Sequence, residues 1–231
     1  MRKRHICTSI LSISIWSSLL LLATLPLRAQ TEKKMLPLQN DSIAFFRNVA
    51  VSVDLVGPLQ LALSDYGQYE AALRVNLKDK YFPIVELGYG KADGEDAATH
   101  LSYKTAAPYG RIGIDFNLMK NKHDANRLYG GVRYAYTNYK FDVYCPDVTD
   151  PYWGEKADFK ANDVKCYYHW LEFVFGIDAK IWGPVRMGWS VRYKRRLFHD
   201  DGDVGRPWYV PGYGKQGNAR LGGTFNVSIE L

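Results

Sequence analysis

Charged side chains alternate with apolar ones along much of this sequence. Between Tyr109 and Leu118, arginine, glycine and aspartate occupy one set of alternate positions, and isoleucine and phenylalanine occupy the other. Because side chains point alternately to the two faces of a strand, such a segment is predicted to be a strand with one charged face. Arginine, the main cation, pairs with carboxylates in a bidentate manner. We therefore predict a network of paired charges made by Asp54, Glu70, Arg74, Glu86, Arg111, Asp115, Arg133, Glu172, Asp178, Arg186, Arg192, Arg220 and Glu230.

Serine and histidine could supply a second kind of chemistry, acyl transfer or hydrolysis. His100, His169, His199, Ser64 and Ser102 fall in or beside the longer segments between the predicted strands. A nucleophilic serine needs a base within hydrogen-bond reach and a third group that orients this base. The sequence has no G-x-S-x-G motif or comparable signature. We expect no catalytic residues and no enzyme, with a lipid-modifying enzyme as the alternative.

Metal and cofactor sites are not predicted either. The segment 199–203, with sequence HDDGD, could offer carboxylates to Ca²⁺. It lacks the glutamate that closes an EF-hand loop, so a solvated acidic loop is expected. The sequence suggests no cofactor.

The apolar faces indicate eight strands, joined alternately by long and short connections. The last of them ends at the final residue. The predicted strands are Val49–Leu55, Tyr69–Leu77, Tyr81–Tyr89, Tyr109–Leu118, Leu128–Tyr139, His169–Lys180, Val185–Lys194 and Ala219–Leu231. An even strand number with short turns at one end and long loops at the other is typical of bacterial membrane barrels. We predict an all-β fold, an eight-stranded antiparallel up-and-down transmembrane β-barrel over residues 48–231, with short periplasmic turns and long extracellular loops. A soluble barrel, with its apolar rows pointing inward around a small apolar ligand, is the alternative.

The N-terminal region has the pattern of an exported protein. A basic start precedes an apolar run from Ile10 to Leu25, and a small residue, Ala29, follows. This predicts a cleaved signal peptide over residues 1–29 and a polar periplasmic tether over residues 30–47. Cleavage would remove four of the 30 basic residues that face 24 acidic ones, so the mature chain would be nearly neutral. No nucleic-acid binding is expected from that balance.

Two cysteines, Cys145 and Cys166, remain after the predicted cleavage. Exported chains meet an oxidising compartment, so a disulfide between them is expected, with two unpaired buried thiols as the alternative. Closing a loop of this length would contribute about 3 kcal/mol in the chain-entropy model.

The charged faces would fill an interior just wide enough for side chains. They could line a polar channel or binding cavity, or neutralise one another as a plug that only stabilises the barrel. The narrow interior favours the plug. Aromatic residues of the long loops could bind partners or pack together over the barrel mouth, and the sequence does not decide between these.

The strand pattern, the signal sequence and the closing strand resemble the small eight-stranded outer-membrane barrels of the OmpA/OmpX type. The chain is also similar to an uncharacterised domain-of-unknown-function family of exported barrels from Bacteroides-type bacteria. The resemblance implies a monomer in the cell outer membrane with a structural, adhesive or envelope-interaction role. It also implies contact with outer-membrane lipids, lipopolysaccharide and the outer-membrane insertion machinery. Such barrels commonly end in an aromatic residue, whereas this chain ends in Leu231.

Overall fold

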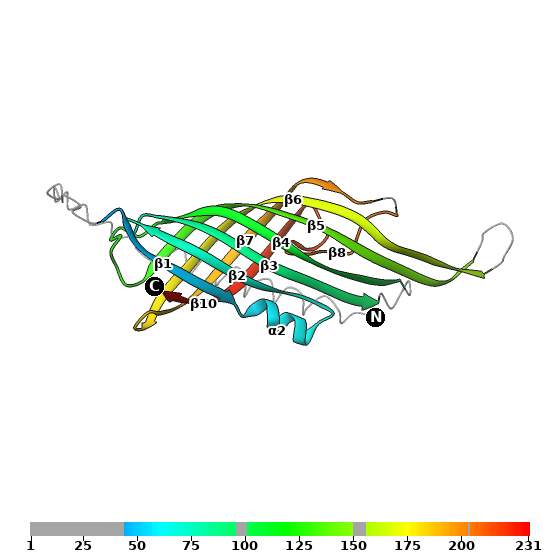
Figure 1. Cartoon of the computed structure of the whole chain (residues 1–231), viewed down its shortest axis with the longest axis horizontal. Coiled ribbons are helices and arrows are strands. Elements are labelled where there is room, and N and C mark those ends of the chain that lie inside the picture. The colour runs from blue at the N-terminus through cyan, green and yellow to red at the C-terminus, as the bar shows by residue number, and fades with distance from the viewer. Residues whose placement is uncertain (1–43, 96–100, 150–155, 203) are drawn as a thin grey trace, which may run out of the picture. The chain divides into compact units, whose positions relative to one another are not determined.

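The chain forms a closed antiparallel barrel of eight strands (Figure 1). The computed structural model describes residues 44–95, 101–149, 156–202 and 204–231. Around the ring, the strand order is β1-β10-β7-β6-β5-β4-β3-β2, so neighbours in sequence are neighbours in the barrel and the up-and-down topology is confirmed. The barrel strands are β1 (Phe46–Asp54), β2 (Tyr66–Leu77), β3 (Tyr81–Glu95), β4 (Ser102–Asn117), β5 (Arg127–Thr149), β6 (Lys156–Trp182), β7 (Val185–Asp200) and β10 (Ala219–Glu230).

The C-terminal strand closes the barrel, as the alternation in its sequence predicts. It pairs with β7 along its length and with β1 from Asn226 to Glu230. At the very end, the backbone N–H of Leu231 donates to the carbonyl of Val49 at 2.7 Å. The first and last strands of the fold are thus joined, and the sheet has no free edge at this level.

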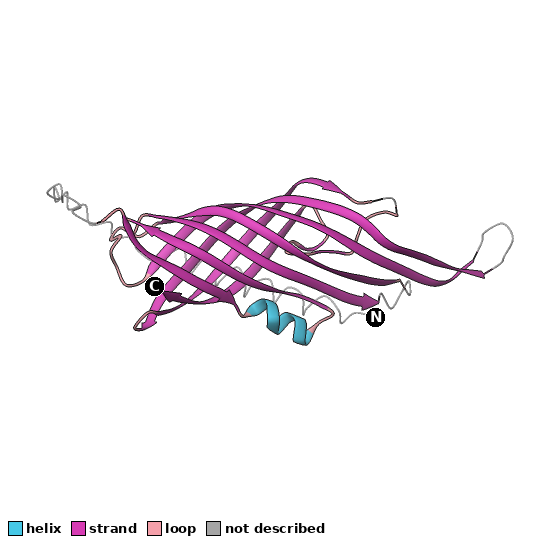
Figure 2. Cartoon of the chain, viewed as in Figure 1, coloured by secondary structure: helices cyan, strands magenta, loops and turns pink. Residues whose placement is uncertain are grey.

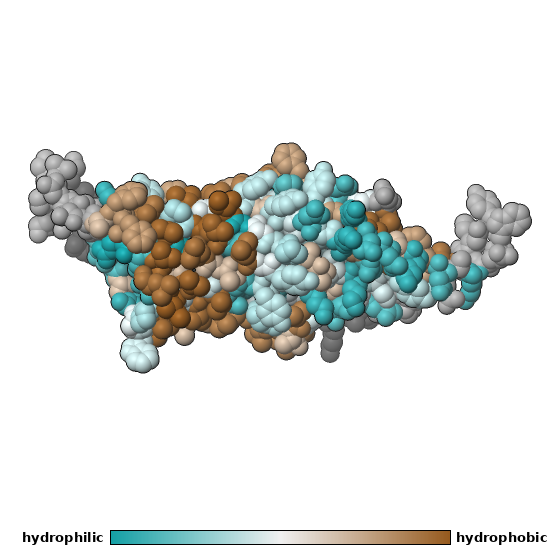
Figure 3. All heavy atoms as spheres, viewed as in Figure 1, coloured by the Kyte–Doolittle hydropathy of each residue, from teal (hydrophilic) through white to brown (hydrophobic). Residues whose placement is uncertain are grey.

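The apolar rows of the strands point outward. Ile112 on β4 is 62% exposed, Phe175 on β6 is 52% exposed and Trp189 on β7 is 64% exposed. Trp189 does contact Phe225, with ring centroids 4.5 Å apart, but on the outer surface. On the face that Figure 3 shows, apolar residues form a band over the part of the barrel near the C-terminus, and mainly hydrophilic residues cover the part beyond it. The interior holds the charged faces, so the alternative of an oily central core is excluded.

Several strands are longer than predicted. The segment 141–165 was expected to be a loop, yet β5 runs to Thr149 and β6 begins at Lys156 (Figure 2). The prediction failed because both faces of this hairpin are rich in polar and aromatic residues, which conceals the alternation. Strand pairing continues where the apolar outer band has ended, in the region that Figure 3 shows as hydrophilic. The predicted loop from Gly90 to Ala107 is likewise mostly strand, within β3 and β4.

A short helix, α2 (Val56–Leu63), follows β1 where a loop was expected. The carboxylate of Asp54 accepts hydrogen bonds from the backbone N–H groups of Val56 and Gly57, at 3.2 and 2.9 Å. These are N–H groups that a helix cannot satisfy internally, and Pro58 in the first turn lacks one. Among the described residues, no helix has the length and apolar character that a helical membrane span requires.

The last predicted loop, Arg195 to Gln216, is structured as well. Strand β7 continues to Asp200, and a small hairpin of β8 (Tyr209–Val210) and β9 (Gly214–Lys215) follows. Tyr209, Val210 and Tyr213 of this hairpin are buried, at 2% exposure or less. The hairpin therefore folds back into the barrel instead of extending into solvent.

The predicted disulfide is wrong. Cys166 on β6 lies opposite Tyr139 on β5, whereas Cys145 of β5 lies opposite Phe159. The cysteines are thus separated along the strands by the distance from residue 139 to 145, about 20 Å at the rise of a strand. A disulfide requires Cα atoms within about 7 Å, so Cys145 and Cys166 do not bridge to each other.

Candidate functional site

The predicted charges meet in the interior as one network centred on Glu86. Its carboxylate accepts hydrogen bonds from Arg111 at 3.1 Å, from Arg192 at 3.0 Å and from Arg133. These four side chains come from β3, β4, β7 and β5, and each is at most 2% exposed. Alternation places every one of them on the inner face, and closure of the barrel brings them together across it.

Arg111 connects this centre to two further carboxylates. Its guanidinium forms an ion pair with Glu70, and its Nε lies 2.9 Å from Glu172. Glu70 also pairs with Arg192 at 2.9 Å, and Glu172 accepts a hydrogen bond of 2.6 Å from the indole of Trp170. Neighbouring charges of opposite sign therefore surround each member of the group.

A second group of charges lies nearer the short turns. Asp115 pairs with Arg74 at 3.0 Å and with Arg133 at 3.1 Å, so Arg133 joins the two groups. Asp178 accepts from Arg186 at 3.1 Å and lies 3.7 Å from Arg74. Glu230 accepts from Arg127 at 2.6 Å and lies 3.6 Å from Arg186.

Burial makes the pairing obligatory. Removing one partner of a buried ion pair costs about 3–5 kcal/mol, because the remaining charge is uncompensated. Inside this barrel each carboxylate of the two groups has at least two cationic neighbours or a cation and an indole. The arrangement neutralises charge and holds the strands in register.

Two predicted members lie outside the network. Asp54 is buried, but its partners are backbone N–H groups of α2 and of Phe225, the latter at 3.1 Å. Arg220 is exposed and donates to the carbonyls of Lys215 and Gln216. Asp54 stands where β1 ends, and Arg220 lies farther along β10, where no β1 residue pairs with that strand. Both therefore lie at the edge of the wall and not at the centre.

One network member, Arg127, was missed. It is the first residue of β5 and lies just before the predicted start of that strand. Its inward position follows the same alternation as Tyr129 and Arg133, all three of which are buried. Extending the predicted strand by one residue would have found it.

An aromatic cluster lies above the charges, towards the long-loop end. Tyr103, Tyr168 and Trp170 of the barrel wall pack with Tyr209 and Tyr213 of the β8–β9 hairpin. The rings of Tyr168 and Tyr213 have centroids 4.9 Å apart. Aromatic residues of the hairpin and of the wall thus pack together at the mouth, whereas the other loop aromatics leave the two options open. Tyr144, Phe159, Tyr167 and Phe198 are exposed, and Tyr152 and Trp153 lie outside the described residues.

Backbone carbonyls of the β8–β9 hairpin accept hydrogen bonds from cations of the barrel interior. Gly212 accepts from Arg111 at 2.7 Å and from the Nζ of Lys194 at 2.7 Å. The ring of Tyr109 lies against Gly212, whose φ is +81°, and a Cβ there would come within 2.5 Å of that ring. Glycine is required at this position, because both the backbone conformation and the close approach exclude a side chain.

The charged part of the lumen is nearly filled. Between Arg74, Glu86, Tyr129 and Asp178, the interior cavity is about 20 Å³. That is about the space of a single water molecule. In the described part of the chain, the lumen is therefore a packed polar core at this level.

A smaller polar cluster holds the turns at the opposite end. Asp79 accepts a hydrogen bond from the side chain of Asn76 at 2.7 Å and contacts the imidazole of His123 at 2.8 Å. Burial opposes ionisation of this carboxyl, but the hydrogen bonds to His123 and Asn76 outweigh it and lower the pKa of Asp79. The cluster ties the β2–β3 turn to the β4–β5 turn.

Among the described residues, Ser64, His169 and His199 make contacts other than a serine–histidine pair. The hydroxyl of Ser64 donates to the carbonyls of Gln60 and Tyr66. His169 contacts the hydroxyl of Tyr134 at 2.6 Å on the outer surface, and His199 lies 3.4 Å from Asp201. His100 lies outside the described residues.

No group of three or more metal-ligating side chains occurs among the described residues. Asp203 of the acidic segment 199–203 lies outside them. Asp201 contacts Gln216 at 2.8 Å and Arg206 at 3.7 Å, so polar and cationic side chains already surround it.

The model of the family described as Domain of unknown function (DUF6048) matches residues 10–231. The chain belongs to this family. The sequence matches none of the curated proteins with which it was compared.

Three solved barrels are similar to the chain, at low identity. The N-terminal β-barrel domain of OprF from Pseudomonas aeruginosa is 10% identical, with a TM-score of 0.39, 80% of this chain covered and 97% of that one. A major outer membrane protein from Thermus thermophilus is 13% identical, with a TM-score of 0.39 and coverage of 80% and 98%. Ail from Yersinia pestis, solved with the heparin analogue sucrose octasulfate, is 10% identical, with a TM-score of 0.36 and coverage of 79% and 93%.

Proposed function

We propose that this protein is a structural outer-membrane barrel whose lumen is closed by its own ion pairs. The observation that carries the proposal is the inversion of polarity between inside and outside. Arg111, Glu86 and Glu172 are buried in the interior, whereas Ile112, Phe173 and Phe175 face outward. In water this arrangement would expose the apolar face, which is unfavourable. A hydrocarbon surrounding removes that unfavourable exposure.

The dimensions of the apolar band support the membrane placement. On β3, Tyr81 and Tyr89 are both about half exposed and mark the two ends of an outward row that includes Val85 and Leu87. Eight residues of strand span about 27 Å, or about 20 Å along the axis of a barrel whose strands tilt by about 40°. Outer-membrane barrels have apolar bands about 25 Å tall, edged by aromatic residues.

The same placement orients the molecule. Short turns, including the one that holds Asp79, would face the periplasm, and the β5–β6 extension would stand outside the cell. The chain would enter the membrane through the outer-membrane insertion machinery after cleavage of residues 1–29, and would contact outer-membrane lipids and lipopolysaccharide as a monomer. Its role would then be structural, adhesive or in envelope interaction, through the surface that β3 to β6 present.

The contacts of the candidate residues favour this proposal over a lipid-modifying enzyme. Ser64 gives its hydroxyl to backbone carbonyls, and in the described part of the chain His169 and His199 contact Tyr134 and Asp201 instead of a serine. The charged interior also argues against a soluble carrier, because an apolar ligand would have to displace paired arginines and carboxylates.

Three measurements test the proposal. Membranes of expressing cells are washed with alkali, and the protein is run on a gel with and without heating in detergent. We expect the protein to remain with the membrane and to migrate faster when unheated. The purified barrel in a planar bilayer is expected to carry no stepwise ion current. Release by alkali would refute the membrane placement, and a regular open conductance would refute the closed lumen.

A further inference from the structure

The barrel wall has a gap on one side, in its outer half. Strand β1 ends at Asp54, opposite Asn226 of β10 and after Val53 has paired with Ala71 of β2. Beyond this point, residues 219–224 of β10 pair only with β7, and residues 66–70 of β2 pair only with β3. Two strand edges therefore face each other without an intervening strand. Such edges do not occur against lipid, and are found only where protein covers them or a cavity adjoins them.

Helix α2 covers part of this gap from the side of β2. A Cβ on Gly67 would lie 2.6 Å from the backbone nitrogen of Leu61, and one on Gly57 would lie 2.2 Å from the carbonyl oxygen of Gln68. Glycines thus let the helix sit directly on the β2 backbone. The helix packs mainly on β2 and only slightly on β10, which leaves a space between the helix and β10.

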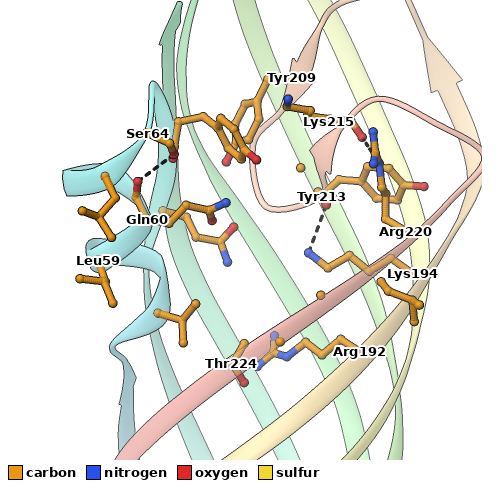
Figure 4. Close-up of a pocket in the computed structure, with 18 residues that line it drawn as sticks. Leu59, Gln60, Ser64, Arg192, Lys194, Tyr209, Tyr213, Lys215, Arg220 and Thr224 are labelled. Carbon is orange, nitrogen blue, oxygen red and sulfur yellow. Dashed lines mark hydrogen bonds between the residues drawn. The ribbon is translucent and has the colours of Figure 1, made fainter. Parts of the chain in front are cut away.

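This space is a cavity of about 590 Å³ that reaches from the outer surface to the top of the charged layer. Ligand pockets commonly measure about 300–1,000 Å³. Figure 4 shows Leu59 and Gln60 of the helix on one side of the space, and Arg192 and Lys194 of β7 on the other. Strand β10 contributes Arg220, Leu221 and Thr224 to its rim.

The charged side chains of the lining are all cationic. Arg192 and Lys194 lie in its buried part and Lys215 and Arg220 at its exposed rim, and no aspartate or glutamate of the described chain lines the cavity. Lys194 is only 7% exposed and gives its Nζ to the carbonyls of Gly212 and Tyr213, at 2.7 and 3.2 Å. Lys215 lies over the rings of Tyr66 and Trp208, and Arg220 donates to two backbone carbonyls. Among the described residues, none of these last three cations has a carboxylate within ion-pair distance, in contrast to the arginines of the central network.

The outer part of the lining is apolar and faces the surroundings of the barrel. Leu59 is 59% exposed, Leu63 is 78% exposed and Leu221 is 74% exposed. Leu221 pairs with Tyr193, an aromatic residue of β7 that is 41% exposed. The opening therefore lies where the headgroups and the first chain segments of the outer leaflet would be, given the membrane placement proposed above.

We propose that this cavity binds an acyl lipid with an anionic phosphate headgroup, whose chain leaves the barrel sideways between α2 and β10. The headgroup phosphate takes the place nearest Lys194, Lys215 and Arg220, and the acyl chain lies along Leu59, Leu63 and Leu221. Charge complementarity fixes the headgroup, and the lateral opening fixes the direction of the chain. The proposed site binds lipid non-covalently, and no bond is made or broken.

The test measures lipid binding by native mass spectrometry of the full mature barrel, released from detergent and titrated with phosphatidylglycerol. Phosphatidylcholine serves as the zwitterionic comparison and oleate as the free fatty acid. We expect phosphatidylglycerol to bind at least about tenfold more tightly than phosphatidylcholine, because both carry a phosphate but the lining cations would repel the trimethylammonium group of phosphatidylcholine. Equal binding of these two lipids would overturn the proposal, and tighter binding of oleate would overturn the choice of a phosphate lipid.

Two variants locate the site. Lys215→Gln with Arg220→Gln removes exposed cations of the rim and should weaken phosphatidylglycerol binding at least about tenfold. Lys91→Gln with Lys165→Gln removes the same charge from exposed positions outside the lining and should leave binding unchanged. Gly222 lines the cavity, and a Cβ there would lie at an ordinary contact distance, 3.6 Å, from the Cε of Lys194. The leucine of Gly222→Leu can therefore extend into the cavity, and this variant should also abolish binding.

Wild-type binding by the rim variant or by Gly222→Leu would overturn the proposal. Heat-modifiable mobility shows whether each variant is folded, so a variant that fails to fold is not mistaken for one that fails to bind. Alkali extraction separately reports the membrane placement. A barrel that stays in the membrane but binds phosphatidylglycerol no better than phosphatidylcholine would refute this inference alone.

Discussion

Replacing Arg111 with methionine tests the central ion-pair network most severely. Arg111 is 2% exposed and contacts the carboxylates of Glu70, Glu86 and Glu172. After its removal, Glu70 and Glu86 would still have Arg192, at 2.9 and 3.0 Å. Glu172 would retain Arg192 at 3.7 Å, the indole of Trp170 and the influence of Lys194, which lies opposite it on β7 without a close ion pair. Glu172 thus loses its closest ion pair, the one at 2.9 Å, and the expected loss is about 3 kcal/mol in free energy of unfolding.

The assay is urea unfolding of the barrel in lipid vesicles, followed by the difference in gel mobility between unheated and heated samples. Arg111→Met with Glu172→Gln removes the stranded negative charge too, and should recover at least half of the loss. Arg195→Met removes an exposed arginine of β7 and should change stability by less than about 0.5 kcal/mol. If Arg111→Met cost less than about 1 kcal/mol, as loss of an exposed pair does, the reasoning about buried charges would be wrong.

Four further outcomes are expected. Phe175→Arg places a charge on the outward face of β6 and should cost about 2–4 kcal/mol in the same vesicle assay, whereas a loss below about 1 kcal/mol would argue against lipid at that face. Gly67→Val forces α2 away from β2 and should lower the free energy of unfolding by about 1–3 kcal/mol. Gly217→Ala should be neutral, because the nearest atom to its new Cβ would be 3.7 Å away, and equal effects of the two variants would refute the close packing. Because the pKa of Asp79 is lowered on folding from the ordinary 3.8, its ionised form stabilises the fold above that value and the stabilisation is lost as the pH falls below it; the stability difference between wild type and Asp79→Asn should therefore shrink in acid, and a constant difference would contradict the assignment. Finally, Cys145 and Cys166 should each react with a maleimide after denaturation without reductant, and resistance of both would restore the disulfide.

Much of the barrel was predictable because its faces are chemically opposite. Where one face must meet hydrocarbon and the other must carry charge, period-two alternation is strong, and the strands around Ile112, Phe175 and Trp189 were found from it. The network members were found individually for the same reason. Their partners were not predictable, because Glu86 and Arg192 are 106 residues apart and meet only when the barrel closes.

The parts that sequence reasoning missed depend on contacts from elsewhere in the fold. Helix α2 has only eight residues, and its position depends on Asp54 and on two glycines at the β2 contact. The β5–β6 extension lacks a greasy face, so its alternation is weak although its pairing is regular. The β8–β9 hairpin is rich in glycine, proline and tyrosine, which is also the composition of an exposed loop. Its burial depends on contacts with wall residues such as Tyr168 and Trp170, which the sequence does not reveal.

The central claim is that apolar side chains face lipid and charged side chains face the interior. Two tryptophans test it directly. Trp189 on β7 is 64% exposed on the outer band, and Trp170 on β6 is completely buried inside. Variants that keep one of them and carry phenylalanine at the other tryptophan positions are reconstituted with lipids that bear a quencher near the bilayer centre. Strong quenching of Trp189 together with none of Trp170 is the predicted result. Quenching of Trp170, or a Trp189 that only a water-soluble quencher reaches, would contradict a barrel with lipid outside and paired charges within.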